Sequence, residues 1–81
     1  MLDLLDVIEA LEAVREKADR LGYIGLSVEA RLRLGEVEIE NGMVKAGRAH
    51  LEQLQKEAQE KGFVLIAREA GVAMKLQSAR R

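Results

Sequence analysis

The sequence of 81 residues contains no cysteine and no proline, and it has only two aromatic residues, Tyr23 and Phe63. Without cysteine the chain has no disulfide, no thiol nucleophile and no thiolate ligand for a metal ion. This composition is compatible with a reducing compartment, and we expect a cytoplasmic protein. Because aromatic residues are so rare, the core must be built from aliphatic side chains.

Long apolar runs and a strong net charge are also missing. No stretch approaches the roughly 18 apolar residues of a membrane span, and the acidic amino terminus is unlike a secretion signal, so we expect no membrane partner. The net charge is −1. The basic residues are spread out and lack an aromatic stacking platform, so we expect no nucleic-acid partner.

The charges are unevenly distributed along the chain. Residues 1–42 carry five basic and ten acidic residues, a net charge of −5, and residues 43–81 carry eight basic and four acidic residues, a net charge of +4. One interpretation is that the solvated helix faces simply differ. The other is that opposite ends attract each other and favour antiparallel or head-to-tail self-association.

The chain repeats itself with a period of 40 residues. A shift by 40 places residues 10–30 on residues 50–70 with six identities, compared with about two expected by chance in a chain rich in Ala, Leu and Glu. The identical pairs are Leu11/Leu51, Glu12/Glu52, Ala18/Ala58, Gly22/Gly62, Glu29/Glu69 and Ala30/Ala70. A period of this size is typical of stacked structural repeats.

Apolar residues recur at steps of three and four in four segments, which predicts amphipathic helices over residues 2–21, 24–40, 44–60 and 63–77. Gly22 and Gly62 end the first and third helices, since glycine adopts the left-handed conformation at little cost. A strand is the alternative for residues 36–40, which alternate in polarity and precede the turn signal Asn41-Gly42. We favour a helix because residues 43–49 would make a poor partner strand.

The second and third predicted helices resemble a tetratricopeptide repeat. The matching residues are Arg31-x2-Leu34-Gly35-x2-Glu38, then Gly42, then Gly47-x3-Leu51-x2-Leu54. In such a unit small residues let two helices approach, and large residues of one helix fill the groove of the other. The residues that would pack the repeat are Leu34, Gly35, Gly42, Gly47, Leu51 and Leu54.

The chain also departs from that family. Arg31 and Glu38 stand where the family often has aromatic residues, no proline follows the unit, and the period is 40 rather than roughly 34 residues. The longer period indicates extended helices. The junction Ala58-x3-Gly62-Phe63-x-Leu65-Ile66-Ala67-Arg68 is similar to junctions in helical arrays of bacterial signalling proteins. The resemblance implies an all-α fold, in which antiparallel helix-turn-helix repeats stack as a short α-solenoid of about four helices.

The resemblance further implies a non-catalytic scaffold for protein–protein interaction that binds a protein or peptide, such as the regulatory part of a bacterial signalling protein. The groove in such arrays is lined by the first helix of each unit, here by Val28, Arg31, Glu38, Arg68 and Val72. Residues 1–81 form a single domain, which we expect to be a fragment of a longer array or to dimerise. The alternative function is a helical homodimerisation or self-assembly module.

Residues suited to catalysis or metal binding are few. His50 is the only histidine and lies off the apolar stripe of its helix, and we expect a solvated position at the edge of a groove. We expect Ser27 to cap the second helix. The acids Asp3, Asp6 and Glu9 complement a helix dipole better than they form a cation cage. The sequence therefore predicts no enzyme, no metal site and no cofactor.

Overall fold

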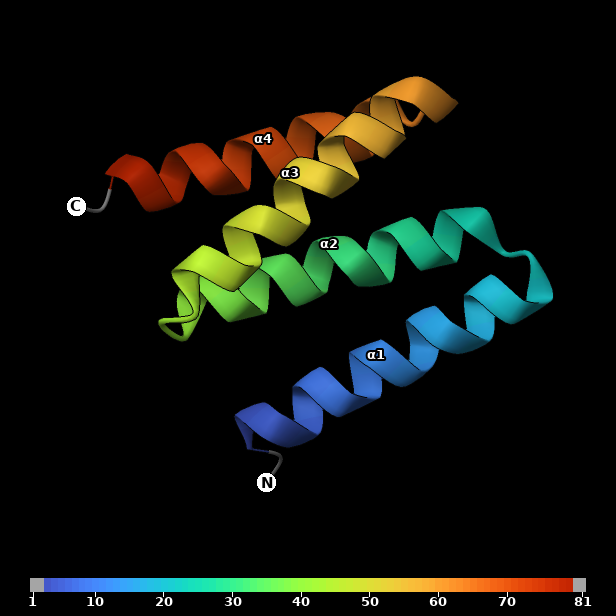
Figure 1. Ribbon diagram of the computed structural model, residues 1–81, viewed down its shortest axis with the longest axis horizontal. Coiled ribbons are helices and arrows are strands. Elements are labelled where there is room, and N and C mark those ends of the chain that lie inside the picture. Colours follow the sequence, from blue (N-terminus) through green and yellow to red (C-terminus); the bar gives the residue numbers. More distant parts are fainter. Residues whose placement is uncertain (1–2, 80–81) are drawn as a thin grey trace.

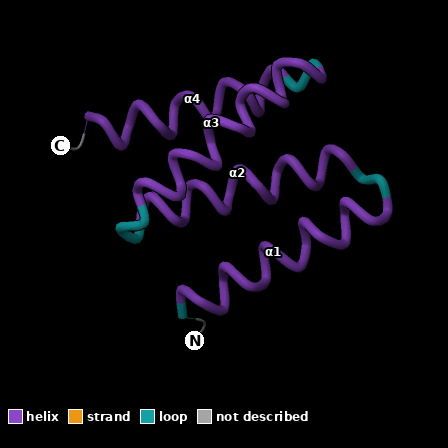
Figure 2. Tube along the Cα trace, viewed as in Figure 1, coloured by secondary structure: helices purple, strands orange, loops and turns teal. Residues whose placement is uncertain are grey.

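The computed structural model describes the backbone of residues 3–79 and the side chains of residues 3–76. The described residues form four helices, α1 (Leu4–Leu21), α2 (Ile24–Glu40), α3 (Val44–Lys61) and α4 (Val64–Ala79) (Figure 1). They contain no strand (Figure 2), so the all-α prediction is confirmed. Each helix end in the structure lies within two residues of the predicted one. The predicted start of the first helix, residue 2, lies outside the described residues.

The helices are joined by tight turns that the sequence anticipates. Gly22 and Gly62 follow α1 and α3 with φ of 78° and 83°, in the left-handed region that favours glycine. The next residue closes each turn in the same way, because the amide nitrogens of Tyr23 and Phe63 donate to the carbonyl oxygens of Ala18 and Ala58, both at 2.8 Å. The two junctions, 40 residues apart, therefore have matching geometry.

The segment that alternates like a strand, residues 36–40, is the last part of α2. Asn41 ends this helix, its side chain donating to the carbonyl oxygen of Val37 at 2.8 Å, and Gly42 follows with φ of 90°. The turn that could have closed a hairpin instead reverses the chain between two helices. Residues 43–49 offer no strand pairing, which is why the helical period prevails over the alternation.

The helices form a thin slab with principal extents of 38 × 33 × 17 Å. α1, α2 and α4 lie roughly side by side, and α3 crosses in front of α2 and α4 (Figure 1). Within the described residues, α3 packs on α2 and α4, α4 also touches α2, and α1 packs on α2 alone. The core is therefore shared by α2, α3 and α4, and α1 lies at one edge.

The core is small and aliphatic, as the composition requires. Its members are Val28 and Leu32 of α2, Leu51 and Leu54 of α3, and Ala70 and Met74 of α4. Complete burial of a leucine stabilises a fold by about 1.5–3 kcal/mol. Leu32, Leu51 and Leu54, the largest fully buried side chains described, therefore contribute most to holding α2 and α3 together.

Two glycines set the spacing between α2 and α3. A Cβ atom on Gly35 would lie 2.5 Å from Leu51 Cδ2, and one on Gly47 would lie 2.8 Å from the carbonyl oxygen of Gly35. Atoms cannot approach this closely, so the helices could not pack at this distance with any larger residue at either position. The Leu51 side chain fills the space that Gly35 leaves.

Ser27 differs from the expectation. It lies in the first turn of α2, buried, and its hydroxyl donates to a carboxylate oxygen of Asp19 on α1 instead of capping the helix. The helix begins three residues earlier, at Ile24, and no side chain caps it. Ser27 thus joins two helices, because its position in the first turn of α2 faces α1.

Candidate functional site

An open groove runs between α2 and α4, with a volume of about 320 Å³. Its apolar lining comes from Ile39 of α2 and from Val72, Ala73 and Leu76 of α4. Val72 and Leu76 are large side chains left about half exposed. Large exposed apolar side chains that line a concave surface are typical of a binding site rather than of ordinary surface.

Charged side chains border this groove. They are Arg33, Glu36, Glu40, Arg68 and Glu69. Arg33 Nη1 lies 2.7 Å from Glu36 Oε1, and this hydrogen bond raises the pKa of Arg33, so that cation is already paired within its own helix. Arg68 is exposed and makes no ion pair with any described residue. A ligand in the groove would therefore meet apolar contacts first and an available guanidinium at the rim.

A second, smaller cleft of about 200 Å³ lies between α1 and α3, with α2 as its floor. Its lining is mainly charged or polar and comprises Glu12, Arg15, Arg31, Leu34, Glu38, His50, Gln53 and Glu57. Two pairs cross it from α2 to α3, a salt bridge between Arg31 and Glu57 and a contact of 2.7 Å between His50 Nδ1 and Glu38 Oε1. These pairs join helices that the core already holds together.

The Arg31–Glu57 pair is the more enclosed of the two. The hydrogen bond from the Arg31 guanidinium lowers the pKa of the Glu57 carboxyl, and the remaining burial of that carboxyl opposes the shift. Both side chains are only partly exposed, so the pair is better sheltered from water than a surface ion pair. Arg31 therefore acts in the structure as a link between α2 and α3.

The structure separates the five residues predicted to line one groove. Arg68 and Val72 lie in the groove between α2 and α4, whereas Arg31 and Glu38 lie in the cleft between α1 and α3. Val28 lines neither, because it is buried in the core with 3% of its surface exposed. The prediction was wrong for Val28, since its side chain packs in the core that α2 shares with α3 and α4.

The groove also contains residues that the sequence did not assign to it. Arg33, Glu36, Ile39 and Glu40 come from α2, and Glu69, Ala73 and Leu76 come from α4. The 40-residue shift held a usable signal for some of them. It places Arg33 on Ala73 and Glu36 on Leu76, so equivalent positions of two helices line the same groove from opposite sides.

The residues predicted to pack the repeat fall into three kinds of position. Gly35, Gly47, Leu51 and Leu54 are buried between α2 and α3, and Gly42 lies in the turn that joins these helices. Leu34 is half-buried and lines the cleft between α1 and α3. Leu34 and Gly35 are adjacent on α2, so they lie on different sides of the helix and face different neighbours.

The two side chains considered above for catalysis, His50 and Ser27, are both paired with acids. His50 is exposed and paired with Glu38, while Ser27 is buried and paired with Asp19. Among the described residues there is no cluster of three His, Asp or Glu side chains that could hold a metal ion. No helix in this part of the chain is long and apolar enough to cross a membrane.

Comparison of the chain with protein-family models, with curated proteins and with solved structures finds no match.

Proposed function

We propose that the chain is a non-catalytic, tetratricopeptide-like scaffold that binds a peptide or helix of another protein in the groove between α2 and α4. The observation that supports this best is the pair Val72 and Leu76, two large apolar side chains left half exposed along a concave surface. If the chain is a tetratricopeptide-like array, α2 and α4 are the first helices of consecutive units, which are the helices that line the groove in such arrays.

The chemistry of the groove indicates the kind of segment it would take. The lining from Ile39, Val72, Ala73 and Leu76 suits one or two bulky apolar side chains. An amphipathic helix places such side chains at positions i, i+3, i+4 and i+7. Arg68 would pair with an acid beside them. We therefore expect a short amphipathic segment that carries an acidic residue next to its apolar face.

Selection of binders from a library of displayed amphipathic peptides tests this proposal. The affinity of a selected peptide is then measured by fluorescence anisotropy for the wild-type chain and for Arg68→Glu. We expect Arg68→Glu to weaken binding roughly tenfold, since a rim charge pair contributes about 1 kcal/mol and reversal adds repulsion.

Arg20→Glu is the matched control, because Arg20 is an exposed arginine on α1, outside the groove. Its affinity should equal that of the wild type. Equal losses in both variants would indicate a net-charge effect, and a selected peptide insensitive to Arg68→Glu and to Leu76→Lys would place the binding surface elsewhere. Either result would contradict the proposal.

A further inference from the structure

Apolar residues at the two edges of the molecule are exposed where their equivalents in the interior are buried. The 40-residue shift pairs Val14 of α1 with Leu54 of α3, and Val72 of α4 with Leu32 of α2. Leu54 and Leu32 are both 0% exposed, whereas Val14 is 41% and Val72 is 48% exposed. The same apolar character is thus present at both places, but only the interior pair has a neighbouring helix to cover it.

Each edge helix presents a line of such residues. On α1 the line consists of Val7, Val14 and Leu21, spaced seven residues apart, and we refer to it as the α1 stripe. On α4 it consists of Leu65, Val72 and Leu76, which we refer to as the α4 stripe. Apart from Val7, which is half-buried, all of these side chains are exposed. Both stripes are therefore unpartnered apolar helix faces.

The molecule itself shows what would cover them. Val7 and Val14 of the α1 stripe are equivalent to Gly47 and Leu54, which are buried on α3. Val72 of the α4 stripe is equivalent to Leu32, which is buried on α2 in the same core. These three stripe residues thus match buried positions of the internal α2–α3 pair, whereas Leu21, Leu65 and Leu76 correspond to Lys61, Gly25 and Glu36, which are exposed or half-buried. We propose that the two stripes bind each other between molecules, so that α1 of one copy of this chain packs antiparallel on α4 of the next copy.

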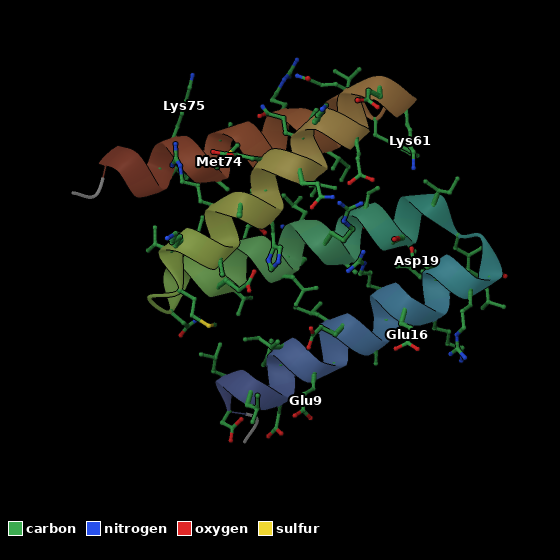
Figure 3. All side chains as sticks on the ribbon, in the orientation of Figure 1. Glu9, Glu16, Asp19, Lys61, Met74 and Lys75 are labelled. Atoms are coloured by element: carbon green, nitrogen blue, oxygen red, sulfur yellow. The ribbon has the colours of Figure 1, made fainter. Side chains whose placement is uncertain are left out.

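The charges favour this occupant over other pairings of the same helices. Figure 3 shows Glu9 and Glu16 on α1 at one edge of the molecule and Lys75 on α4 at the opposite edge. Glu9 and Glu16 follow Val7 and Val14 by two residues and so lie on the other side of α1 from the α1 stripe, where they act through the overall charge of that edge and not by direct pairing across the contact. The half of the chain that contains α1 has a net charge of −5 and the half that contains α4 has +4. Pairing α1 with α1, or α4 with α4, would bring like charges together.

The antiparallel orientation also places specific charges opposite each other. Gly35 of α2 lies against Leu51 and near Gly47 of α3, and the shift converts these positions to Lys75, Leu11 and Val7. Lys75 of one copy would then lie beside Val7 of the other, one helical turn from Asp3 and next to Asp6 at the start of α1. Those acids cap α1 and are exposed, so they are accessible to a cation.

The intermolecular pair would differ from the internal one in its spacing. Gly35 and Gly47 let α2 and α3 approach closely, but Lys75 and Val7 occupy the equivalent positions. α1 and α4 of two copies would therefore lie further apart, with the aliphatic stem of Lys75 along the apolar seam and its ammonium group in water. Because this contact would be looser and would bury fewer leucines, we expect α1 and α4 of two copies to bind each other less tightly than α2 and α3 pack within one chain.

The contact joins two different surfaces, so it is heterologous. Every copy that uses its α4 stripe still has a free α1 stripe, and the assembly grows until a ring closes or continues as a filament. Light scattering of the 81-residue chain over a range of concentrations should show a mass that exceeds that of the monomer and rises with concentration.

Two single variants test which surfaces are involved. Val14→Lys blocks the α1 stripe and Val72→Lys blocks the α4 stripe, and each position is already partly exposed, so the fold should persist. We expect each variant alone to be monomeric. An equimolar mixture should form a heterodimer of twice the monomer mass, because each variant supplies the intact surface that the other lacks, and this dimer cannot grow.

Leu5→Lys is the matched control, since Leu5 is an exposed leucine on α1 that lies outside the α1 stripe, and it should associate like the wild type. Circular dichroism verifies the fold of each variant, and Leu21→Lys and Leu65→Lys replace any variant that unfolds. A monomeric wild type would overturn the proposal and assign the stripes to another occupant. Loss of association in Val72→Lys alone, with no heterodimer in the mixture, would overturn it in favour of a two-fold contact between α4 helices.

These outcomes are distinguishable from those of the peptide experiment. Val72 and Leu76 belong to both the α4 stripe and the groove, but Val14 lies on α1, outside the groove lining. A Val14→Lys variant that is monomeric and still binds a selected peptide would support both proposals. A Val14→Lys variant that loses peptide binding together with association would indicate that the peptide binds only to the assembly, and would contradict the proposal that the groove of one chain is the binding site.

Discussion

At the residue scale, the absence of a side chain matters as much as its presence. Gly35 and Gly47 are buried where α2 crosses α3, and the space beside Gly35 is filled by Leu51. Glycine weakens an isolated helix by about 1 kcal/mol relative to alanine. At Gly35, the burial of Leu51 against the helix backbone stabilises the fold by more than this loss of helix propensity.

Gly35→Ala should lower the free energy of unfolding by about 1–3 kcal/mol, although alanine is the better helix former. The new Cβ would lie 2.5 Å from Leu51 Cδ2 and 2.6 Å from Leu51 Cγ, and Leu51 is fully buried, so it cannot move aside easily. Urea denaturation monitored by circular dichroism measures the change.

Gly71→Ala is the informative comparison for that measurement. Its Cβ would meet the end of the flexible Gln55 side chain at 2.8 Å, which can rotate away. We expect this variant to be neutral or more stable by up to about 1 kcal/mol. Equal destabilisation by both alanines would show that the contact with Leu51 is not the cause.

The ion pair between Arg31 and Glu57 makes the free energy of unfolding depend on pH. The pKa of Glu57 is lowered in the folded state, so the unfolded state binds more protons in acid. The stabilisation is present above the unfolded value of about 4.3 and is lost as the pH falls through the folded value.

The free energy of unfolding of Glu57→Gln should therefore be lower than that of the wild type by about 1 kcal/mol or less at pH 7. The difference should shrink towards zero at pH 3. Denaturant titrations at several pH values follow it, with Glu60→Gln as the control because Glu60 is exposed on the same helix. If the difference for Glu57→Gln did not depend on pH, the pair would not stabilise the charged carboxylate.

At the element scale, the four helices are not equally secured. α3 contributes four buried residues and packs on two other helices, while α1 packs on α2 alone. Of the described side chains of α1, Ala18 alone is buried. Local opening requires little free energy where few apolar contacts must be broken.

Amide hydrogen exchange should therefore be fastest in α1 among the four helices, apart from their terminal turns. We expect protection in the middle of α1 to be at least tenfold below that around Leu51 and Leu54, since each 1.4 kcal/mol of opening free energy corresponds to a factor of ten. Mass spectrometry of exchanged peptides measures this, at a concentration where the chain is monomeric. Equal protection of α1 and α3 would mean that the chain opens only as a whole.

At the scale of the whole molecule, the charge and the exposed apolar surface both distinguish two opposite edges, one formed by α1 and the other by α4. Acidic residues dominate the half with α1 and basic residues the half with α4, and an exposed apolar stripe runs along each of these helices. Both properties favour contact between opposite edges of two molecules.

Self-association should weaken as salt is added. The Debye length falls from about 10 Å at 0.1 M to about 3 Å at 1 M ionic strength, which screens the attraction between the two edges. We expect the dissociation constant to rise severalfold over this range in sedimentation experiments. Tighter association in high salt would mean that apolar contacts dominate and that the charges do not select the orientation.

The positions of the helices were predictable because their signals are local. The spacing of apolar residues, the glycines after α1 and α3, and Asn41-Gly42 after α2 each act within a few residues. The same holds for residues 36–40, where an alternation in polarity over only five residues competes with the helical spacing of apolar residues. The candidate groove was harder to predict, since it depends on which sides of α2 and α4 face each other.

The sequence by itself determined the all-α fold, the places where the chain turns, the aliphatic core and the difference in charge between its halves, since these follow from composition and from spacing along the chain. Only the tertiary structure decided that Val28 is buried, that Arg31 pairs with Glu57, and that Arg33 and Ile39 line a groove with Val72. α2 is in contact with α1, α3 and α4 at once. Its helical period identifies which residues share a side of the helix, but not which neighbour that side meets.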